Sequence, residues 1–185
     1  MIQKEIGDRN GEASSYANLG ILYGSVGEYE SARENLEKSL AINKEIRDRF
    51  GEATYYRNLE VLYNLVGEFE NVSHYNEKLL AISRNIGARQ LIGISYLKMG
   101  YKFYSPIKYH MANKYNKKAF VIFKDIRERE GLASFYLNQG NVELAVGNSN
   151  KAKQYFENAL AISNETGNMV TEVSGNLCLG DFFFG

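Results

Sequence analysis

Apolar residues recur at three- and four-residue steps along most of the chain, which is the spacing of one face of an α-helix. The first such stretch places Tyr16, Leu19, Tyr23 and Val26 on one stripe and ends near Gly27. A second stretch then restarts the pattern with Tyr29, Ala32, Leu36, Leu40 and Ile42. The pattern predicts two helices joined by a short turn.

The helix pair is repeated along the chain with a period of 40 residues. Four columns keep this period: Ile6, Ile46, Ile86 and Ile126; Arg9, Arg49, Arg89 and Arg129; Tyr16, Tyr56, Tyr96 and Tyr136; and Ile42, Ile82, Ile122 and Ile162. Such a period is typical of stacked units that bury their apolar faces only against neighbours. We therefore expect one all-α array over 1–185, with repeats at about 8–47, 48–87, 88–127 and 128–167 and a half repeat at 168–185. Because the last unit is incomplete and ends in apolar residues, we expect the chain to be a fragment of a longer array.

Capping and turn residues agree with this division. Asp8 and Asp48 stand where a first helix needs an N-cap. Gly27, Gly67 and Gly147 stand where the chain turns between the helices of a pair.

A second set of glycines falls inside the first helices, at Gly20, Gly100 and Gly140. Glycine within a helix costs about 1 kcal/mol relative to alanine, so a periodic glycine needs a packing reason. We predict that the second helix of each pair crosses here, with small residues opposite: Ala32, Ala112 and Ala152.

These residues carry a family resemblance. Tyr16, Leu19, Gly20 and Tyr23, followed by Ala32 and Leu36, resemble the tetratricopeptide repeat signature. The segment LAINKEIRDRFGEATYYRNL, residues 40–59, resembles the 40-residue subclass found in Pins-type polarity adaptors, in large animal multi-repeat scaffolds and in arrays attached to signalling proteins. The resemblance implies a right-handed α-solenoid of helix-turn-helix repeats that acts as a protein–protein interaction scaffold.

Composition excludes several other classes. The chain has 22 Lys and Arg residues against 22 Asp and Glu residues, without the basic cluster that duplex nucleic acids require. No apolar run approaches the roughly 20 residues that span a bilayer. The single cysteine, Cys178, excludes an internal disulfide and is interpreted as a structural thiol. We expect a cytoplasmic protein that binds neither nucleic acid nor membrane.

Catalytic and metal-binding patterns are missing from the sequence. His74 and His110 fall on second helices of different repeats, without convergent ligands or a nucleophile nearby. The glycines follow the repeat period and form no phosphate-binding loop. We therefore expect no enzymatic activity, no cofactor and no metal.

The surfaces of the first helices remain as the candidate site. Residues one step from the core stripe should face a concave groove, and the predicted peptide-binding residues are Asn18, Arg57, Asn58, Val61, Leu97, Lys98, Tyr101, Leu137, Asn138 and Asn141. Within this set Asn18, Asn58 and Asn138 form one column, which Lys98 interrupts and in which Cys178 replaces the next asparagine. An amide can pair with the backbone of an extended peptide. In the polarity adaptors that the chain resembles, such an asparagine ladder holds a partner peptide.

The predicted ligand is an extended, partly acidic peptide segment, because Arg57 and Lys98 lie on this face. The asparagines could instead bond neighbouring first helices and fix the stack, and the two roles are not exclusive. Two alternative functions stay open. The array could be a spacer that self-associates through its apolar end, Phe182, Phe183 and Phe184, or a sensor arm of a larger signalling protein.

Overall fold

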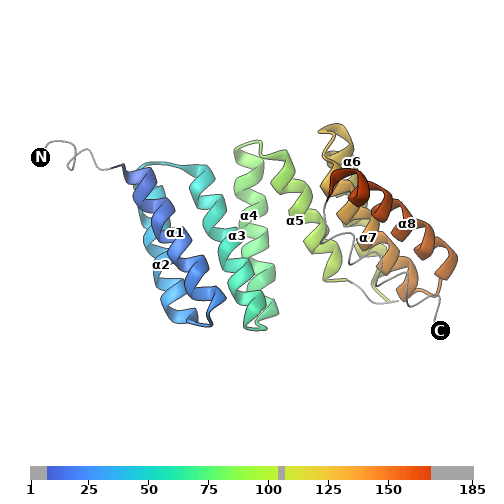
Figure 1. The fold of residues 1–185 in the computed structure, drawn as a ribbon, viewed down its shortest axis with the longest axis horizontal. Coiled ribbons are helices and arrows are strands. Elements are labelled where there is room, and N and C mark those ends of the chain that lie inside the picture. The colour runs from blue at the N-terminus through green and yellow to red at the C-terminus, as the bar shows by residue number, and fades with distance from the viewer. Residues whose placement is uncertain (1–7, 104–106, 168–185) are drawn as a thin grey trace, which may run out of the picture. The chain divides into compact units, whose positions relative to one another are not determined.

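The computed structural model describes residues 8–103 and 107–167, and within these residues the only regular secondary structure is α-helix, with turns between the helices. The helices are α1 (Arg9–Ser25), α2 (Tyr29–Glu45), α3 (Arg49–Leu65), α4 (Phe69–Asn85), α5 (Arg89–Tyr101), α6 (Tyr109–Asp125), α7 (Arg129–Ala145) and α8 (Ser149–Thr166) (Figure 1). Odd-numbered helices are the first helices of the repeats and even-numbered helices the second. The all-α class and the stacked helix-turn-helix repeats are confirmed.

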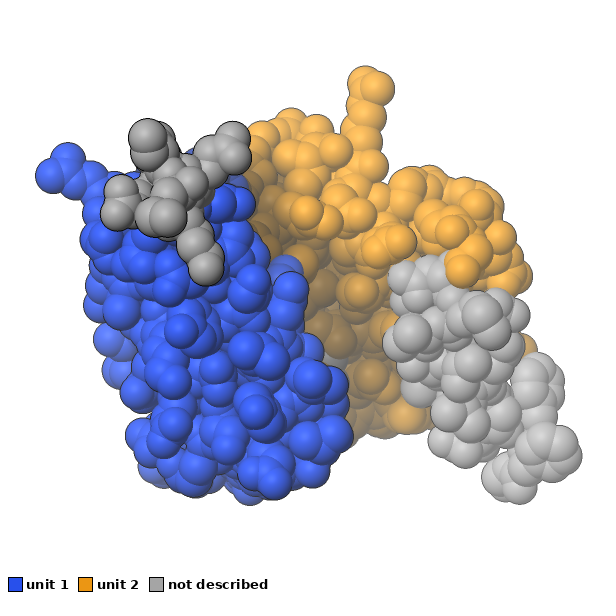
Figure 2. Space-filling model, turned by 60° about the vertical axis from the view of Figure 1, so that its left-hand side comes forward, with its two compact units in different colours: residues 1–87 blue, residues 88–185 orange. Residues whose placement is uncertain are grey.

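The chain divides into two compact units, which Figure 2 colours separately. Unit 1 comprises Met1–Gly87 with helices α1 to α4, and unit 2 comprises Ala88–Gly185 with helices α5 to α8. In unit 1, α1 packs on α2 and α3 on α4, while α2 and α1 both contact α3. Unit 2 repeats the scheme: α5 packs on α6, α7 on α8, and α7 contacts both α6 and α5. Each unit thus brings its two first helices side by side.

Side-chain caps and left-handed turns set the helix boundaries. Asp8 accepts a hydrogen bond from the backbone N–H of Gly11 at 2.8 Å, and Asp48 accepts from Phe50 and Gly51. The predicted N-caps are therefore confirmed. The turn glycines Gly27, Gly67 and Gly147 adopt φ values of +83°, +77° and +81°, a conformation in which a Cβ is strained. These three turn positions are also as predicted.

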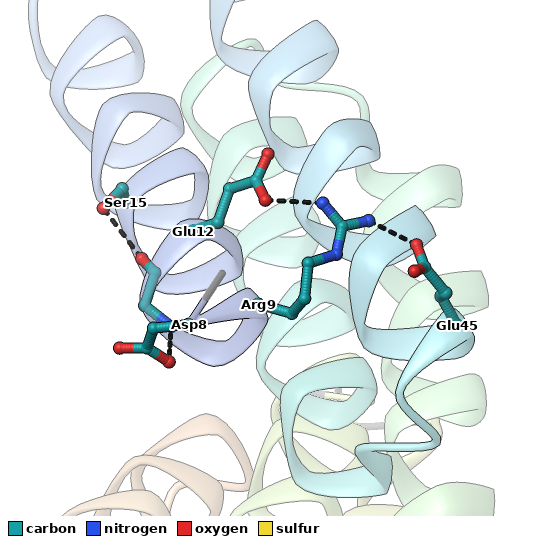
Figure 3. A network of polar contacts seen from close by, with 6 residues as sticks. Asp8, Arg9, Glu12, Ser15 and Glu45 are labelled. Carbon is teal, nitrogen blue, oxygen red and sulfur yellow. Dashed lines mark hydrogen bonds and ion pairs between the residues drawn. The ribbon is translucent and has the colours of Figure 1, made fainter. Parts of the chain in front are cut away.

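Three of the four periodic arginines join the two helices of their repeat, at the end of the pair opposite the turn. Arg9, in the first turn of α1, lies between Glu12 and Glu45 and bonds both carboxylates (Figure 3). Arg89 pairs in the same way with Asp125, and Arg129 with Glu165. The second repeat has Asn85 at this position, and there Arg49 pairs with Glu52 of its own helix at 2.9 Å. Exposed pairs of this kind contribute little to stability because water screens them, so the repeat is held mainly by its core.

The glycines within the first helices mark close approaches between the paired helices, as predicted. A Cβ at Gly20 would lie 2.7 Å from the Leu36 side chain and 3.1 Å from the carbonyl oxygen of Ala32. Ala32, Ala112 and Ala152 are all fully buried. In unit 1 the core continues through Leu36, Tyr55, Leu59 and Leu62.

The buried tyrosine of the unit 1 core should make stability depend on pH at high pH. Burial raises the pKa of Tyr55 above its ordinary value, with further contributions from Tyr75 and Glu37. The unfolded chain loses this proton near pH 10 while the folded chain keeps it, so the contribution is complete below about pH 10 and decreases as pH rises further. We expect a loss of up to about 1.4 kcal/mol per pH unit in this range.

Urea unfolding at a series of pH values above neutrality checks this expectation. Tyr55→Phe removes the titrating group and should therefore flatten part of the alkaline slope, while the remaining tyrosines and lysines titrate as before. An identical slope in the two proteins would show that the Tyr55 hydroxyl is as accessible in the folded state as in the unfolded state.

Candidate functional site

The first helices of unit 2 enclose a pocket of about 340 Å³. Helix α5 supplies Gln90, Ile94, Leu97, Lys98 and Tyr101, and helix α7 supplies Glu130, Gly131, Ser134 and Asn138. Phe123 of α6 and Glu128, just before α7, complete the lining. The pocket therefore gathers four of the predicted groove residues, namely Leu97, Lys98, Tyr101 and Asn138, on adjacent first helices.

These four side chains differ widely in exposure. Leu97 is buried at 6% exposure, and Lys98 and Asn138 are half-buried. Tyr101 is 64% exposed, an unusual position for a large aromatic side chain. Leu137 and Asn141, also predicted, are half-buried on α7 but do not line the pocket.

Unit 1 has a second pocket, of about 260 Å³, at the equivalent repeat position. Its lining residues Asn10, Ser14, Ala17, Asn43, Asp48, Gly51 and Thr54 stand 80 residues before Gln90, Ile94, Leu97, Phe123, Glu128, Gly131 and Ser134. The same space between two first helices is thus lined in unit 1 by mostly polar side chains. Asn43, at its base, is 4% exposed and donates weakly to Ser39 at 3.4 Å.

The predicted residues of unit 1 lie outside this smaller pocket. Asn18 and Arg57 are exposed, Val61 is 51% exposed, and Asn58 is buried at 8% exposure. On α1 and α3 they provide an exposed cation and an exposed aliphatic side chain, but the structure does not gather them into one cavity.

The asparagine column divides into two environments. Asn138 of α7 donates from Nδ2 to the backbone carbonyl of Leu97 in α5 at 3.3 Å. This contact between first helices is the one that the structural alternative predicts. Asn58 of α3 has its Nδ2 buried without an acceptor among the described residues. The half-buried Asn138 also lines the pocket, so it lies both at the contact between α5 and α7 and beside the cavity.

We expect Asn138→Ala to destabilise unit 2 by about 0.5–1.5 kcal/mol, because it removes the bond to Leu97. Asn58→Ala should cost less in unit 1, since a buried donor without a partner carries a desolvation penalty that the substitution relieves. Urea unfolding of the two variants, with hydrogen exchange to separate the units, measures the difference. A larger loss in Asn58→Ala would show that its amide is bonded in solution.

Sequence reasoning missed the residues that give each pocket its chemistry. Phe123 and Asn43 belong to second helices, whereas all the predicted groove residues belong to first helices, and Glu128 and Glu130 stand at the start of a first helix. A signal for the first pair was present. Their column reads Asn43, Ser83, Phe123 and Ser163, and it changes chemistry between repeats while the preceding column keeps isoleucine throughout.

Other sequence features add no further site among the described residues. His74 and His110 are exposed on α4 and α6, each with its ring edge against a neighbouring tyrosine. Within 8–103 and 107–167, no three His, Cys, Asp or Glu side chains are placed to hold a metal ion. None of the described helices combines the length and apolar character that crossing a bilayer requires. Cys178 and Phe182, Phe183 and Phe184 lie outside the described residues.

Comparison with known proteins agrees with the repeat architecture. Two tetratricopeptide repeat models match the chain, one at residues 11–85 and one at residues 132–166. Repeats of this family generally mediate protein–protein interactions and are typically non-catalytic. No curated protein matches the chain. The crystal structure of BtubC (BKLC) from P. vanneervenii is similar with a TM-score of 0.69, covering 97% of this chain and 85% of that one. At 18% sequence identity this likeness concerns the fold alone. By its repeat signature, its paired helices and both family matches, the chain belongs to the tetratricopeptide repeat family.

Proposed function

We propose that the chain is a non-enzymatic scaffold that binds an extended, partly acidic peptide segment along its first helices. The observation that carries the proposal is the unit 2 pocket, where Leu97, Lys98, Tyr101 and Asn138 meet between α5 and α7. A pocket of about 340 Å³ is near the lower end of the roughly 300–1,000 Å³ that small-molecule sites occupy. It suits one or two side chains of a partner better than a cofactor.

The chemistry of these four residues fits a peptide. Leu97 and the exposed ring of Tyr101 offer apolar contact, Asn138 carries an amide that can bond a backbone, and Lys98 attracts a carboxylate. Arg57 in unit 1 is exposed on the corresponding face of α3 and adds a second cation. Exposed aromatic side chains beside a cavity are typical of interaction surfaces.

The test is binding of the full chain to an array of extended peptides in acidic versions and in versions with Gln for Glu and Asn for Asp. We expect acidic members with a Kd of about micromolar order. Hydrogen exchange of the complex should protect the amides of α5 and α7 more than those of α6 and α8. Lys98→Gln should weaken acidic peptides and leave their amide versions unchanged.

Two results would contradict the proposal in different ways. Equal binding of acidic and amide peptides would remove the preference for acidic ligands. Protection confined to second helices would place the binding surface elsewhere on the repeats.

A further inference from the structure

The pockets of the two units stand at the same repeat position but differ in polarity. Ile94, Leu97 and Phe123 make the unit 2 pocket largely apolar. Ser14, Ala17 and Asn43 stand at these positions in unit 1. At the base of the unit 1 pocket the Asn43 amide stands where unit 2 has the Phe123 ring, so a large apolar side chain would meet a polar group there and make less apolar contact. The pocket of unit 2 is therefore the one suited to an apolar anchor.

Opposite charges stand at the two ends of the unit 2 pocket. Glu128 and Glu130 line it at the start of α7, and Glu130 is exposed. Lys98 lines it near the end of α5 and occupies there the repeat position that Asn138 occupies in α7. Because α5 and α7 are equivalent first helices of one unit, the row of Lys98 lies about eight residues beyond the row of Glu130. At about 1.5 Å per residue this separates the rows by about 12 Å.

The distance between the two charged rows predicts how far apart the charged residues of the ligand should be. An extended peptide advances by about 3.3 Å per residue, so about 12 Å corresponds to roughly four residues. A side chain anchored in the middle would then have its oppositely charged neighbours about two residues away on either side, since alternate side chains of an extended strand point to the same face.

We propose that the unit 2 pocket is an anchor site for a protein segment in which one large apolar side chain is flanked, two residues away on either side, by one basic and one acidic residue. The basic residue faces Glu128 and Glu130, and the acidic residue faces Lys98. The inference rests on the proposed peptide-binding function and specifies its ligand more closely. Arg57 and Lys98 predict only that the ligand carries acidic residues, whereas the acidic end of the pocket predicts a basic residue as well.

The test uses fluorescence anisotropy of labelled seven-residue peptides with the full chain. The probe is acetyl-Ser-Lys-Ser-Leu-Ser-Glu-Ser-amide, together with its reversed charge order, because either chain direction satisfies the pocket. Comparison peptides carry Ser in place of Leu, or two charges of the same sign. We expect one charge order to bind about tenfold more tightly than each comparison peptide, as for a hot-spot anchor.

Two variants form a matched pair. Ser134→Tyr should fill the unit 2 pocket and weaken the probe about tenfold or more, whereas Thr54→Tyr fills the equivalent pocket of unit 1 and should leave the affinity unchanged. Circular dichroism of both variants checks their helix content.

Lys98→Glu should weaken the probe, and a probe with Lys in place of Glu should recover the affinity. A misfolded protein would not show this recovery.

The outcomes separate the inference from the function on which it rests. Acidic peptides that bind equally well with Ser or Leu at the anchor, or equal losses in Ser134→Tyr and Thr54→Tyr, overturn the anchor site while peptide binding stands. Absence of binding for all these peptides and for the acidic array overturns both.

Discussion

Phe123→Ala is expected to lower the free energy of unfolding of unit 2 by about 3–5 kcal/mol. Phe123 is fully buried in α6, and its ring occupies the space that glycine leaves on both first helices of the unit. A Cβ at Gly93 of α5 would lie 2.6 Å from the ring, and one at Gly131 of α7 would lie 2.3 Å from it. Since glycine has no side chain to move into the vacated volume, the cavity should close poorly, which places the loss in the upper part of the range for such substitutions.

Urea unfolding followed by circular dichroism measures this loss, and native-state hydrogen exchange assigns it to α5, α6 and α7. Val121→Ala is the matched control, because Val121 lies on the same helix and is 63% exposed. The control should change stability by less than about 0.5 kcal/mol. A loss below about 1 kcal/mol in Phe123→Ala would mean that the unit closes around the cavity or that the ring is not its packing centre.

Much of the fold could be predicted because each repeat packs its two helices against each other and against the neighbouring repeat of its unit in the same way. A residue that recurs every 40 positions faces the same neighbours in every unit, so its role can be inferred from the column as a whole. Asp8 and Asp48 as caps and Gly27 as a left-handed turn follow from local backbone requirements that act within a few residues. No long-range information was needed for any of them.

The candidate site was predictable only in part, because burial depends on neighbouring helices. The helical period places Leu97, Lys98 and Asn138 on one face of the first helices, and in the structure all three line the unit 2 pocket. It does not reveal that Asn58 is buried while Asn18, in the same column, is exposed. Asn58 stands on α3, which has the preceding first helix α1 beside it, whereas no first helix precedes α1 among the described residues. The column alone does not contain this difference.

The base of each pocket escaped prediction for a related reason. Asn43 and Phe123 occupy one column, and their side chains differ in both size and polarity. A comparison of repeats assigns a role to residues that stay constant, so it assigns none to this position, although the variation itself is visible in the sequence. Such a variable position beside constant ones is where an array of similar repeats acquires different ligand preferences.

Gly20→Leu is expected to destabilise unit 1 by about 1–3 kcal/mol. The new Cβ would fall 2.7 Å from the side chain of Leu36, which is buried in the core at 2% exposure. It would also lie 3.1 Å from the carbonyl oxygen of Ala32, a backbone atom that moves only with the whole of α2. The helix propensity of leucine offsets the strain by less than about 1 kcal/mol, so overpacking should dominate.

Gly24→Ala, one turn further along α1, separates packing from propensity. There a Cβ would lie 3.5 Å from Leu62 and 3.9 Å from Ala32, which are ordinary van der Waals contacts. The substitution should therefore stabilise the unit by up to about 1 kcal/mol, because alanine replaces glycine inside a helix without strain. Thermal and urea unfolding of both variants give the two signs directly. If Gly20→Leu left the free energy of unfolding unchanged, α1 and α2 would have to move apart at this crossing without cost. Close packing would then no longer explain the glycines at the Gly20 position or the alanines at the Ala32 position.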